Sequence, residues 1–356
     1  MKEAEKSFKR ISAWETGEAF PTYSQLEKMA ERFRMPVAVF FFPEPPNLPS
    51  IQETFRTLPD TEFQRLPSQI RLLLRKAKSL QLNLDELTGG RNPHERLITR
   101  DLAFSPDVRI EVMARTVREY LGTTLEEQMS WADSDDALKK WRSILLDVGV
   151  FVFKDAFRHQ GFSGFCLSDE RFPLIYVNNS FPKTRQIFSL FHELAHLLFD
   201  TSGVDSADDS YISELVGNSK QIEIICNRFS AHFLLPDVIL NREIEGEEIS
   251  EAAAERIASK YHISRESVYR RFLDRDLITA QQYETSAQKW ARQKGAYENG
   301  GDYYRTKLAY LGREYVELAL KEYHRNRIDE NQLADYLMVK PRNVSNLEEY
   351  FIRGSG

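Results

Sequence analysis

The sequence feature that most constrains this chain is an apolar helical run at residues 183–199 that carries two histidines. His192 and His196 are four residues apart, and this spacing places both imidazoles on one face of a helix. Most other positions are apolar, so the helix is expected to be buried, where imidazoles are costly without a partner. A shared divalent cation is the partner that this spacing favours. Glu193 is turned about 100° from His192 around the helix axis, so it is expected to approach a water molecule at that cation without being a ligand.

A catalytic zinc site normally has three protein ligands, so a third donor is needed. Residues 197–215 contain no histidine, which argues against a third histidine shortly after the pair. We therefore expect the third ligand to be a carboxylate on a following helix. The candidate is Glu223, at the start of a helical run that ends before Pro236. Asn227 lies one turn later on the same face, where it is expected to orient Glu223.

Other side chains are alternatives for these roles. Glu214 is a second candidate for the carboxylate ligand. Cys226 could bind as a thiolate, although a small buried cysteine more often serves packing. His232 falls on nearly the opposite face of the Glu223 helix and is expected to be structural. Asp200 is expected to be a surface group at the end of the histidine helix.

Proline and glycine residues divide the 356-residue chain into four segments. The pattern predicts an α+β chain that is mostly helical, with a small sheet near the histidine helix. The proposed domains are 1–42, 43–104, 105–275 and 276–356.

Several elements can be predicted inside these segments. Thr22 and Gln25 have the spacing of a capping box, which starts a helix. The second segment holds a proline-rich connector and one long helix with an apolar stripe from Ile70 to Leu87. Short apolar strands are expected at 150–153 and 174–177, and the last segment is expected to be all helical.

Composition narrows the class of protein. Hydrophobic residues make up 42% and charged residues 29%, an ordinary globular balance, and no apolar run reaches the roughly 18 residues of a membrane span. The net charge of −6 argues against a positive potential over the whole protein that would attract nucleic acid, although a local basic face is still possible. Two cysteines and a polar amino terminus without a signal peptide lead us to expect a cytoplasmic location.

Two stretches, 161–199 and 223–236, closely resemble the ImmA/IrrE family of metallo-endopeptidases, also called peptidase family M78. The family pattern has a strand ending in Val-Asn, an arginine-containing stretch, a Phe-x-Leu-x-His-Glu helix and a later Glu-x-x-Ala-Asn-x-Phe helix. Its counterparts here are Val177-Asn178, Arg185, Phe188 through Glu193, and Glu223 through Phe229, with Cys226 in place of the usual alanine. The resemblance implies a zincin-like fold, Zn²⁺ as cofactor, the ligands His192, His196 and Glu223, and Glu193 as the catalytic base.

The resemblance also implies a function. It indicates a zinc-dependent endopeptidase that cleaves a protein, typically a helix-turn-helix repressor or antitoxin encoded nearby. The alternative is a transcriptional regulator or antitoxin component whose peptidase-like domain senses metal or ligand without cutting. The strand at 174–177 is expected to pair with an extended substrate, and Tyr176 and Arg185 are candidates for stabilising the oxyanion.

Residues 7–42 resemble the second half of an Xre-type helix-turn-helix domain, which often precedes this peptidase domain. The resemblance rests on Ile11, Trp14-Glu15, Gly17, Pro21-Thr22 and Leu26. The first two helices of that domain are missing, so Ser7–Trp14 would be a recognition helix without the helix that packs behind it. Two roles are therefore possible for this segment: it binds DNA, or it is a remnant of such a domain that packs against the chain or binds a partner.

Two later segments also carry resemblances. Residues 250–273 look like a helix-turn-helix that lies inside the peptidase domain, and we interpret them as scaffold with Arg270-Arg271 on a solvated face. The stretch at 300–312 resembles the long members of the family, without indicating what the last segment does.

Overall fold

The structure is a computed structural model that describes residues 13–14, 16–33, 66–159, 161–201, 204–206, 217–292 and 302–353. The chain divides into two compact units, Met1–Ser50 and Ile51–Gly356. Its fold is α+β and mostly helical with a small sheet, as the sequence predicts. Among the described helices, none has the length and apolar character that crossing a bilayer requires.

The first unit contains helix α3 (Tyr23–Phe33), which begins with the predicted capping box. The Thr22 backbone N–H donates to Gln25 Oε1 at 2.8 Å, and the Gln25 backbone N–H donates to Thr22 Oγ1 at 3.3 Å. Most of the proposed recognition helix at 7–14 and the proline-rich connector at 43–49 lie outside the described residues. The helix-turn-helix resemblance therefore stays a prediction, as does DNA binding.

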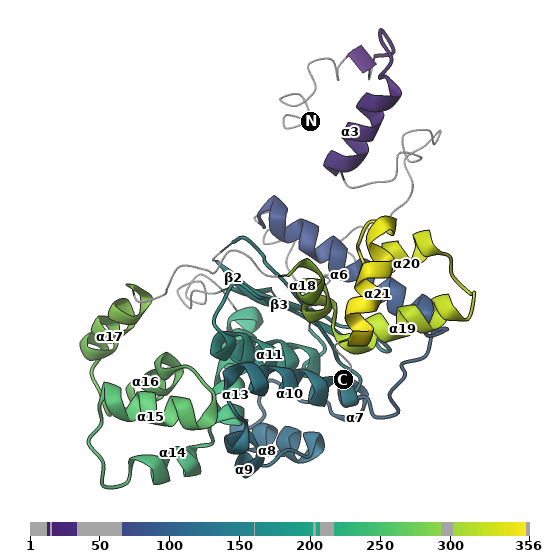
Figure 1. The fold of residues 1–356 in the computed structure, drawn as a ribbon. Helices are drawn as coiled ribbons and strands as arrows, with labels where there is room; N and C mark the ends of the chain where they lie inside the picture. The colour runs from purple at the N-terminus through teal and green to yellow at the C-terminus, as the bar shows by residue number, and fades with distance from the viewer. Residues whose placement is uncertain are drawn as a thin grey trace. The chain divides into compact units, whose positions relative to one another are not determined.

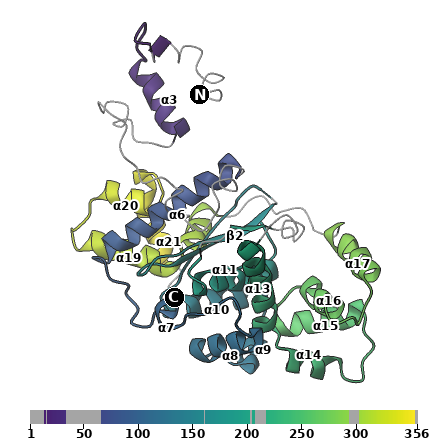
Figure 2. The same ribbon diagram turned by 180° about the vertical axis from the view of Figure 1, so that it is seen from behind.

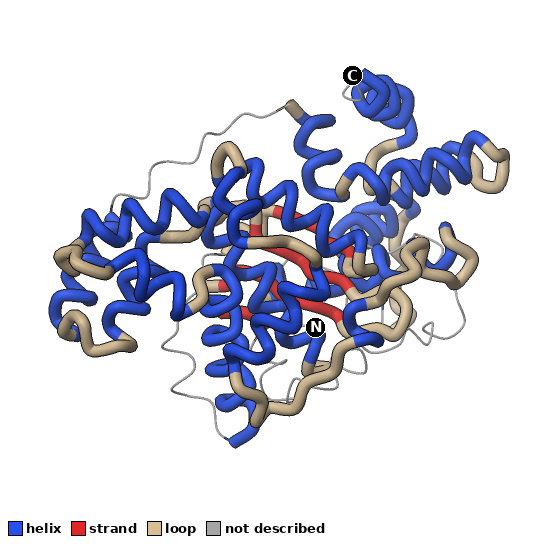
Figure 3. The backbone as a smooth tube through the Cα atoms, turned by 90° about the horizontal axis from the view of Figure 1, so that it is seen from below, coloured by secondary structure: helices blue, strands red, loops and turns tan. Residues whose placement is uncertain are grey.

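A four-stranded sheet with the order β1-β3-β2-β4 lies between helices in the second unit (Figure 3). β1 and β3 run parallel, and β2 is antiparallel to both β3 and β4. The predicted strands at 150–153 and 174–177 are confirmed as β1 and β3, whereas the sequence pattern did not predict β2 or β4. The strands are β1 (Phe151–Asp155), β2 (Phe162–Leu167), β3 (Leu174–Asn178) and β4 (Val204–Ser206).

The sheet order corrects the expectation that residues 174–177 pair with a substrate. β3 is hydrogen-bonded to β1 on one side and to β2 on the other, so its backbone groups are already used. The strands at the ends of this order are β1 and β4. Strand addition needs a free edge, and β3 does not have one.

Helices cover both faces of the sheet (Figures 1 and 2). Side chains of β3 alternate between the faces: Ile175 and Val177 join the core built with α10, α11 and α13, whereas Leu174 and Tyr176 join the core built with α6 and α19. The helices of the first core are α7 (Ile98–Asp101), α8 (Ile110–Leu121), α9 (Leu125–Ser130), α10 (Ser134–Asp147), α11 (Lys183–Leu198), α13 (Gly217–Leu234), α14 (Asp237–Ile244), α15 (Glu251–Tyr261), α16 (Arg265–Leu273) and α17 (Ala280–Arg292).

The second core confirms the long predicted helix and an all-helical end of the chain. All seven residues of the predicted stripe between Ile70 and Leu87 are buried in α6. Within this end of the chain, α18 and α19 are separate helices because Gly312 between them adopts φ +88, a conformation that interrupts a helix and favours glycine. The helices are α6 (Ser68–Leu87), α18 (Tyr303–Leu311), α19 (Arg313–His324), α20 (Glu330–Tyr336), the 3-10 turn η2 (Pro341–Asn343) and α21 (Val344–Arg353).

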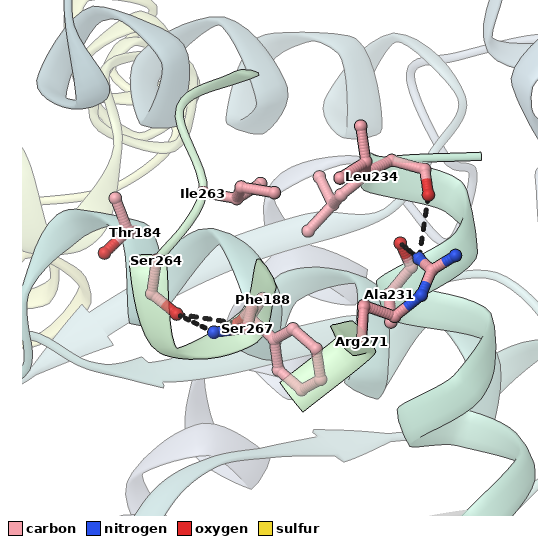
Figure 4. Close-up of a pocket in the computed structure, with 9 residues that line it drawn as sticks. Thr184, Phe188, Ala231, Leu234, Ile263, Ser264, Ser267 and Arg271 are labelled. Carbon is pink, nitrogen blue, oxygen red and sulfur yellow. Dashed lines mark hydrogen bonds between the residues drawn. The ribbon is translucent and has the colours of Figure 1, made fainter. Parts of the chain in front are cut away.

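Helix α16 contacts the end of α13 through Arg271, and this corrects the expected position of that residue. Instead of lying on a solvated face, Arg271 is buried and donates from Nη1 to the carbonyl oxygens of Ala231 at 2.9 Å and Leu235 at 2.8 Å (Figure 4). These carbonyls lie at the end of α13, where the last turn leaves acceptor capacity that Arg271 uses, although Ala231 O also accepts the Leu235 backbone N–H at 3.1 Å. Arg270 is exposed as expected, so only one member of the pair is a surface residue.

Candidate metal centre

Helix α11 brings the two histidines of the motif together in the interior. His192 and His196 lie one turn apart and are buried, and their Nε2 atoms are 3.1 Å from each other. The rings meet in this way because neighbouring turns of a helix stack residues i and i+4 on one face. The helix can be buried at this point because its other sides are apolar and pack against the sheet and against α10 and α13.

Helix α13 supplies the carboxylate. Glu223 Oε2 lies 3.3 Å from His192 Nε2, and Glu223 Oε1 lies 3.3 Å from His196 Nε2. α13 is held against α11 by stacked rings of Phe191 and Phe233, whose centroids are 4.1 Å apart. The apolar packing of two helices therefore sets the position of a buried polar cluster, which joins residues 31 positions apart in the sequence.

The three side chains fit a small divalent cation. Their ligand atoms lie within 4.8 Å of one another, and the closest separations are 3.1–3.3 Å. Zinc binds nitrogen and oxygen ligands at about 2.0–2.2 Å, and tetrahedral angles at that distance separate neighbouring ligand atoms by about 3.3 Å. The observed spacing is therefore compatible with one ion held by the two Nε2 atoms and the Glu223 carboxylate.

Each imidazole has a hydrogen-bond partner at Nδ1, and these partners set the direction in which the Nε2 lone pairs point. His192 Nδ1 is 3.0 Å from Asn227 Oδ1, and His196 Nδ1 is 3.1 Å from Thr201 Oγ1. The Thr201 hydroxyl donates its hydrogen to the His196 carbonyl oxygen at 3.0 Å, so it accepts from Nδ1. With the amide of Asn227 oriented as it is, each ring carries its proton on Nδ1, which leaves the Nε2 lone pairs for a cation.

These contacts differ from the sequence-based expectation in two ways. Asn227 was expected to orient Glu223, but its side chain contacts His192 instead. Thr201 was not predicted at all. A hydroxyl residue just after the end of the histidine helix was the available signal, since such a residue can fold back onto the last turn. Asp200, by contrast, is exposed and bonded to Ser168 at 2.7 Å, which agrees with a helix-end surface group.

Glu193 lies on the side of α11 that faces strand β2. The side chain is fully buried, and a Cβ atom placed on Gly164 of β2 would lie 3.4 Å from Glu193 Oε1 and 3.2 Å from the Tyr176 carbonyl oxygen. Strand and carboxylate can therefore approach each other closely because residue 164 has no side chain. The acid next to the histidines is held between helix and sheet in a space that it nearly fills.

Glu223 is an anion in this environment. Burial alone would raise the pKa of its carboxyl, but the adjacent His196 and His192 rings more than offset burial and hold the pKa well below the usual range. A bound divalent cation would take the place of the positive charge that protonated rings supply, and the Glu223 carboxylate with two neutral imidazoles would then form a ligand set with one negative charge.

The remaining sequence candidates lie elsewhere. Cys226 is fully buried in the apolar core and does not belong to the metal cluster, and His232 forms a separate group with Asp237 at 3.6 Å. Tyr176 projects to the opposite face of the sheet, where its hydroxyl is 3.3 Å from Asp155 Oδ2, so its proposed oxyanion role is corrected. Arg185 lies two turns before His192, with its guanidinium over the Phe188 ring at 5.4 Å. Glu214 lies outside the described residues.

Comparison with known proteins adds one positive finding. No curated protein matches the chain. A family model does match, and the matched region extends from the end of α10 through the sheet to the end of α16. Residues 146–273, which contain the histidine pair, Glu193 and Glu223, thus form an IrrE N-terminal-like domain of the Peptidase_M78 family.

Proposed function

We propose that this protein is a zinc-dependent endopeptidase whose active site is the centre formed by His192, His196 and Glu223. The observation that carries this proposal is the convergence of two Nε2 atoms and one carboxylate at 3.1–3.3 Å, with a second carboxylate on the next residue after His192. Two histidines and one glutamate are a known ligand set of catalytic zinc, which keeps a further position for water or substrate.

Zinc bound there would supply Lewis acidity, which activates water and polarises a carbonyl group. The protein residues supply the proton transfers. Glu193 takes a proton from the attacking water on its carboxylate and then delivers the proton to the leaving amine. Asn227 and Thr201 keep the two imidazoles in the tautomer that binds metal. The close approach of the Glu193 carboxylate to β2 at Gly164, directly after His192 in α11, supports this role.

We propose that the substrate is a protein, and that an extended segment pairs with β4 rather than with β3. β4 is at the end of the sheet order and pairs only with β2 among the described strands. It follows α11 directly in the chain, so its edge is close in sequence to His196. A helix-turn-helix repressor or antitoxin encoded near this gene is the substrate class that the family resemblance supports.

One observation favours a second candidate function, a regulator that binds metal without cutting. His192, Glu193, His196 and Glu223 are each at most 8% exposed, which suits a metal that joins two helices as well as a metal that acts on a substrate. In that case the ion would stabilise the packing of α11 on α13, and metal supply would be the signal.

The decisive experiment compares metal content and proteolysis in the wild type and Glu193→Gln. Each protein is analysed for bound metal and then incubated with purified helix-turn-helix repressor encoded next to this gene. The matched control is Glu248→Gln, which removes an exposed carboxylate inside the same domain.

A peptidase requires that wild type and Glu248→Gln cut the repressor, while Glu193→Gln retains metal and cuts at least about 100-fold more slowly. If all three proteins bind metal and none of them cuts, the regulator is supported. If Glu193→Gln cuts as fast as wild type, the assignment of the base is wrong.

A further inference from the structure

A second polar site lies in a cavity of about 340 Å³ that is separate from the metal ligands. Strand β1, helix α10, the beginning of α11 and helix α18 contribute its walls. Two carboxylates line it, Asp135 and Asp302. Five cationic side chains also line it, a formal excess of three positive charges: Lys139, Arg142, Lys154, Lys183 and Arg305.

Lys154 is the unusual member of this group. It is only 6% exposed, yet no hydrogen bond or ion pair joins its amine to another residue in the described parts of the chain. Its side chain lines the cavity, so the amine faces open space rather than the apolar core. Burying an ammonium group without a counter-charge is unfavourable, and such groups in proteins are normally paired.

Neither carboxylate forms an ion pair with Lys154 in the described residues, although the charge of Asp135 acts on its amine from a distance. Asp135 binds two other amines, with Lys139 Nζ at 2.7 Å and Lys183 Nζ at 3.3 Å. Asp302 caps α18 by accepting the backbone N–H of Arg305 at 2.8 Å. Both carboxylates that line the cavity therefore already have other partners.

Arg142 holds the cavity walls together without neutralising them. Its guanidinium donates to the carbonyl oxygen of Val152 on the edge of β1 at 2.8 Å and to that of Ala309 on α18 at 2.9 Å. Both acceptors are neutral, and the carboxylate that acts on Arg142, Glu314, forms no ion pair with it among the described residues. Burial, together with the charges of Arg142 and Lys183, lowers the pKa of Lys154 to about 7, which is the cost that a bound anion would remove.

We propose that this cavity binds a small phosphate-bearing anion, with Lys154 at its base and Arg305 at its entrance as the anion-binding side chains. A phosphoryl group at neutral pH carries up to two negative charges and several acceptor oxygens, which the excess of cationic donors can satisfy. Lysine is a common phosphate ligand, and a cavity of this volume lies at the small end of the range for small-molecule sites.

The walls of the cavity come from two regions of the chain, the peptidase-family domain and helix α18, so a ligand in the cavity would contact both. Lys154 and Lys183 belong to the peptidase-family domain, whereas Arg305 belongs to α18 outside it. Lys183 is also the first residue of α11, the helix that carries the histidines. A bound anion would therefore strengthen the contact between α18 and β1 next to the start of the metal-binding helix.

The test uses the full chain with its metal and measures anion binding by calorimetry and by the shift in Tm. The probes are inorganic phosphate and glycerol 2-phosphate, each compared with sodium chloride at equal ionic strength. The site variants are Lys154→Met, which keeps a linear apolar side chain, and Arg305→Gln, which changes an exposed residue. The controls are Lys140→Met and Arg115→Gln, which remove exposed cations outside the cavity.

We expect at least one of the two phosphate probes to raise Tm beyond the chloride effect, and we expect both site variants to bind it at least tenfold more weakly than wild type. The controls should match wild type. Which probe binds more tightly distinguishes a free phosphate from a phosphate ester. Without any probe, Lys154→Met should have a Tm equal to or above that of wild type, because it removes an unpaired buried amine.

Three results would overturn the proposal. One is no binding of either probe beyond the chloride effect, and another is equal affinity in wild type and both site variants. The third is loss of phosphate binding when a chelator removes the metal, which would assign the anion to the metal centre instead.

Discussion

The two buried polar sites of this protein differ in how their charges are compensated. At the metal centre, Glu223 lies against two imidazoles, and each imidazole has a partner on its far side. At the α18 cavity, Lys154 is equally buried but has no partner among the described residues. The first site is crowded and organised around one point, whereas the second has open volume and excess positive charge. The comparison teaches that the two sites call for different ligands: a small cation would suit the first, as proposed above, whereas the second has the volume and charge for a larger anion.

The largest expected effect is loss of metal from the first site. His196→Ala removes one of three ligands and leaves Glu223 with a single imidazole, so we expect metal content to fall from about one ion per chain to nearly none. Elemental analysis after dialysis measures this directly, with His324→Ala as the control because His324 is exposed. Retention of a full equivalent of metal by His196→Ala would show that the ion binds elsewhere.

The next effect concerns the residues that orient the imidazoles. Asn227→Ala and Thr201→Val each remove the partner of one Nδ1 atom, and we expect metal affinity to weaken about 10- to 100-fold. Competition with a metal-binding dye gives the affinities. Thr201→Ser keeps the hydroxyl and should bind as wild type does. Equal affinity in Thr201→Val and Thr201→Ser would mean that the hydroxyl does not orient His196.

A smaller effect is expected from Gly164→Ala, which tests how crowded the first site is. The added Cβ would lie 3.2 Å from the Tyr176 carbonyl oxygen, so β2 and β3 must separate by a few tenths of an ångström, and it would come into van der Waals contact with Glu193 Oε1 at 3.4 Å. We expect proteolysis of the repressor to slow by about tenfold while metal content stays unchanged. Metal loss in this variant would contradict a local effect on Glu193.

The smallest effect is a pH dependence of stability at the second site. The pKa of Lys154 is lowered from 10.5 to about 7, so the unfolded chain binds more protons than the folded chain between these values, and stability rises with pH there. Lys154→Met lacks this dependence. We therefore expect the free energy of unfolding of the wild type, relative to Lys154→Met, to rise by about 1 kcal/mol or more from pH 7 to pH 9.

Denaturant titrations at several pH values measure this difference. The charged and titratable groups around the amine are common to both proteins and largely cancel: Asp135, Lys139 and Arg142 from α10, Lys183 from α11, and Asp302, Arg305 and Tyr310 at α18. A difference that stays constant with pH would show that Lys154 is protonated throughout, and hence paired.

Local sequence patterns predicted individual helices and strands better than they predicted which elements lie next to each other. The capping box of Thr22 and the apolar stripe of α6 are confirmed because helix caps and buried stripes depend on residues a few positions apart. The positions of β2 and β4 were not predicted, and the edge position expected for residues 174–177 was wrong. Strand order depends on pairing between distant segments, which no local period encodes.

The candidate site shows the same division. The spacing of His192 and His196 is enough to put two imidazoles on one face, whatever the rest of the chain does. Tyr176 was misplaced because strand side chains alternate between faces, and only the packing of the sheet decides which face meets α11. Arg271 was expected in solvent because a basic pair usually lies there, but its guanidinium is buried against carbonyl oxygens at the end of α13.

The sequence by itself therefore determined the helices, the histidine pair and the adjacent Glu193, since these follow from side-chain type and short spacings. Only the tertiary structure decided which groups meet: Glu223 across the α11–α13 packing, Thr201 behind His196, and Lys154 with Arg305 in one cavity. The physical reason is that helix periodicity acts over a few residues, whereas the compensation of buried charge depends on groups that packing brings together from distant parts of the chain.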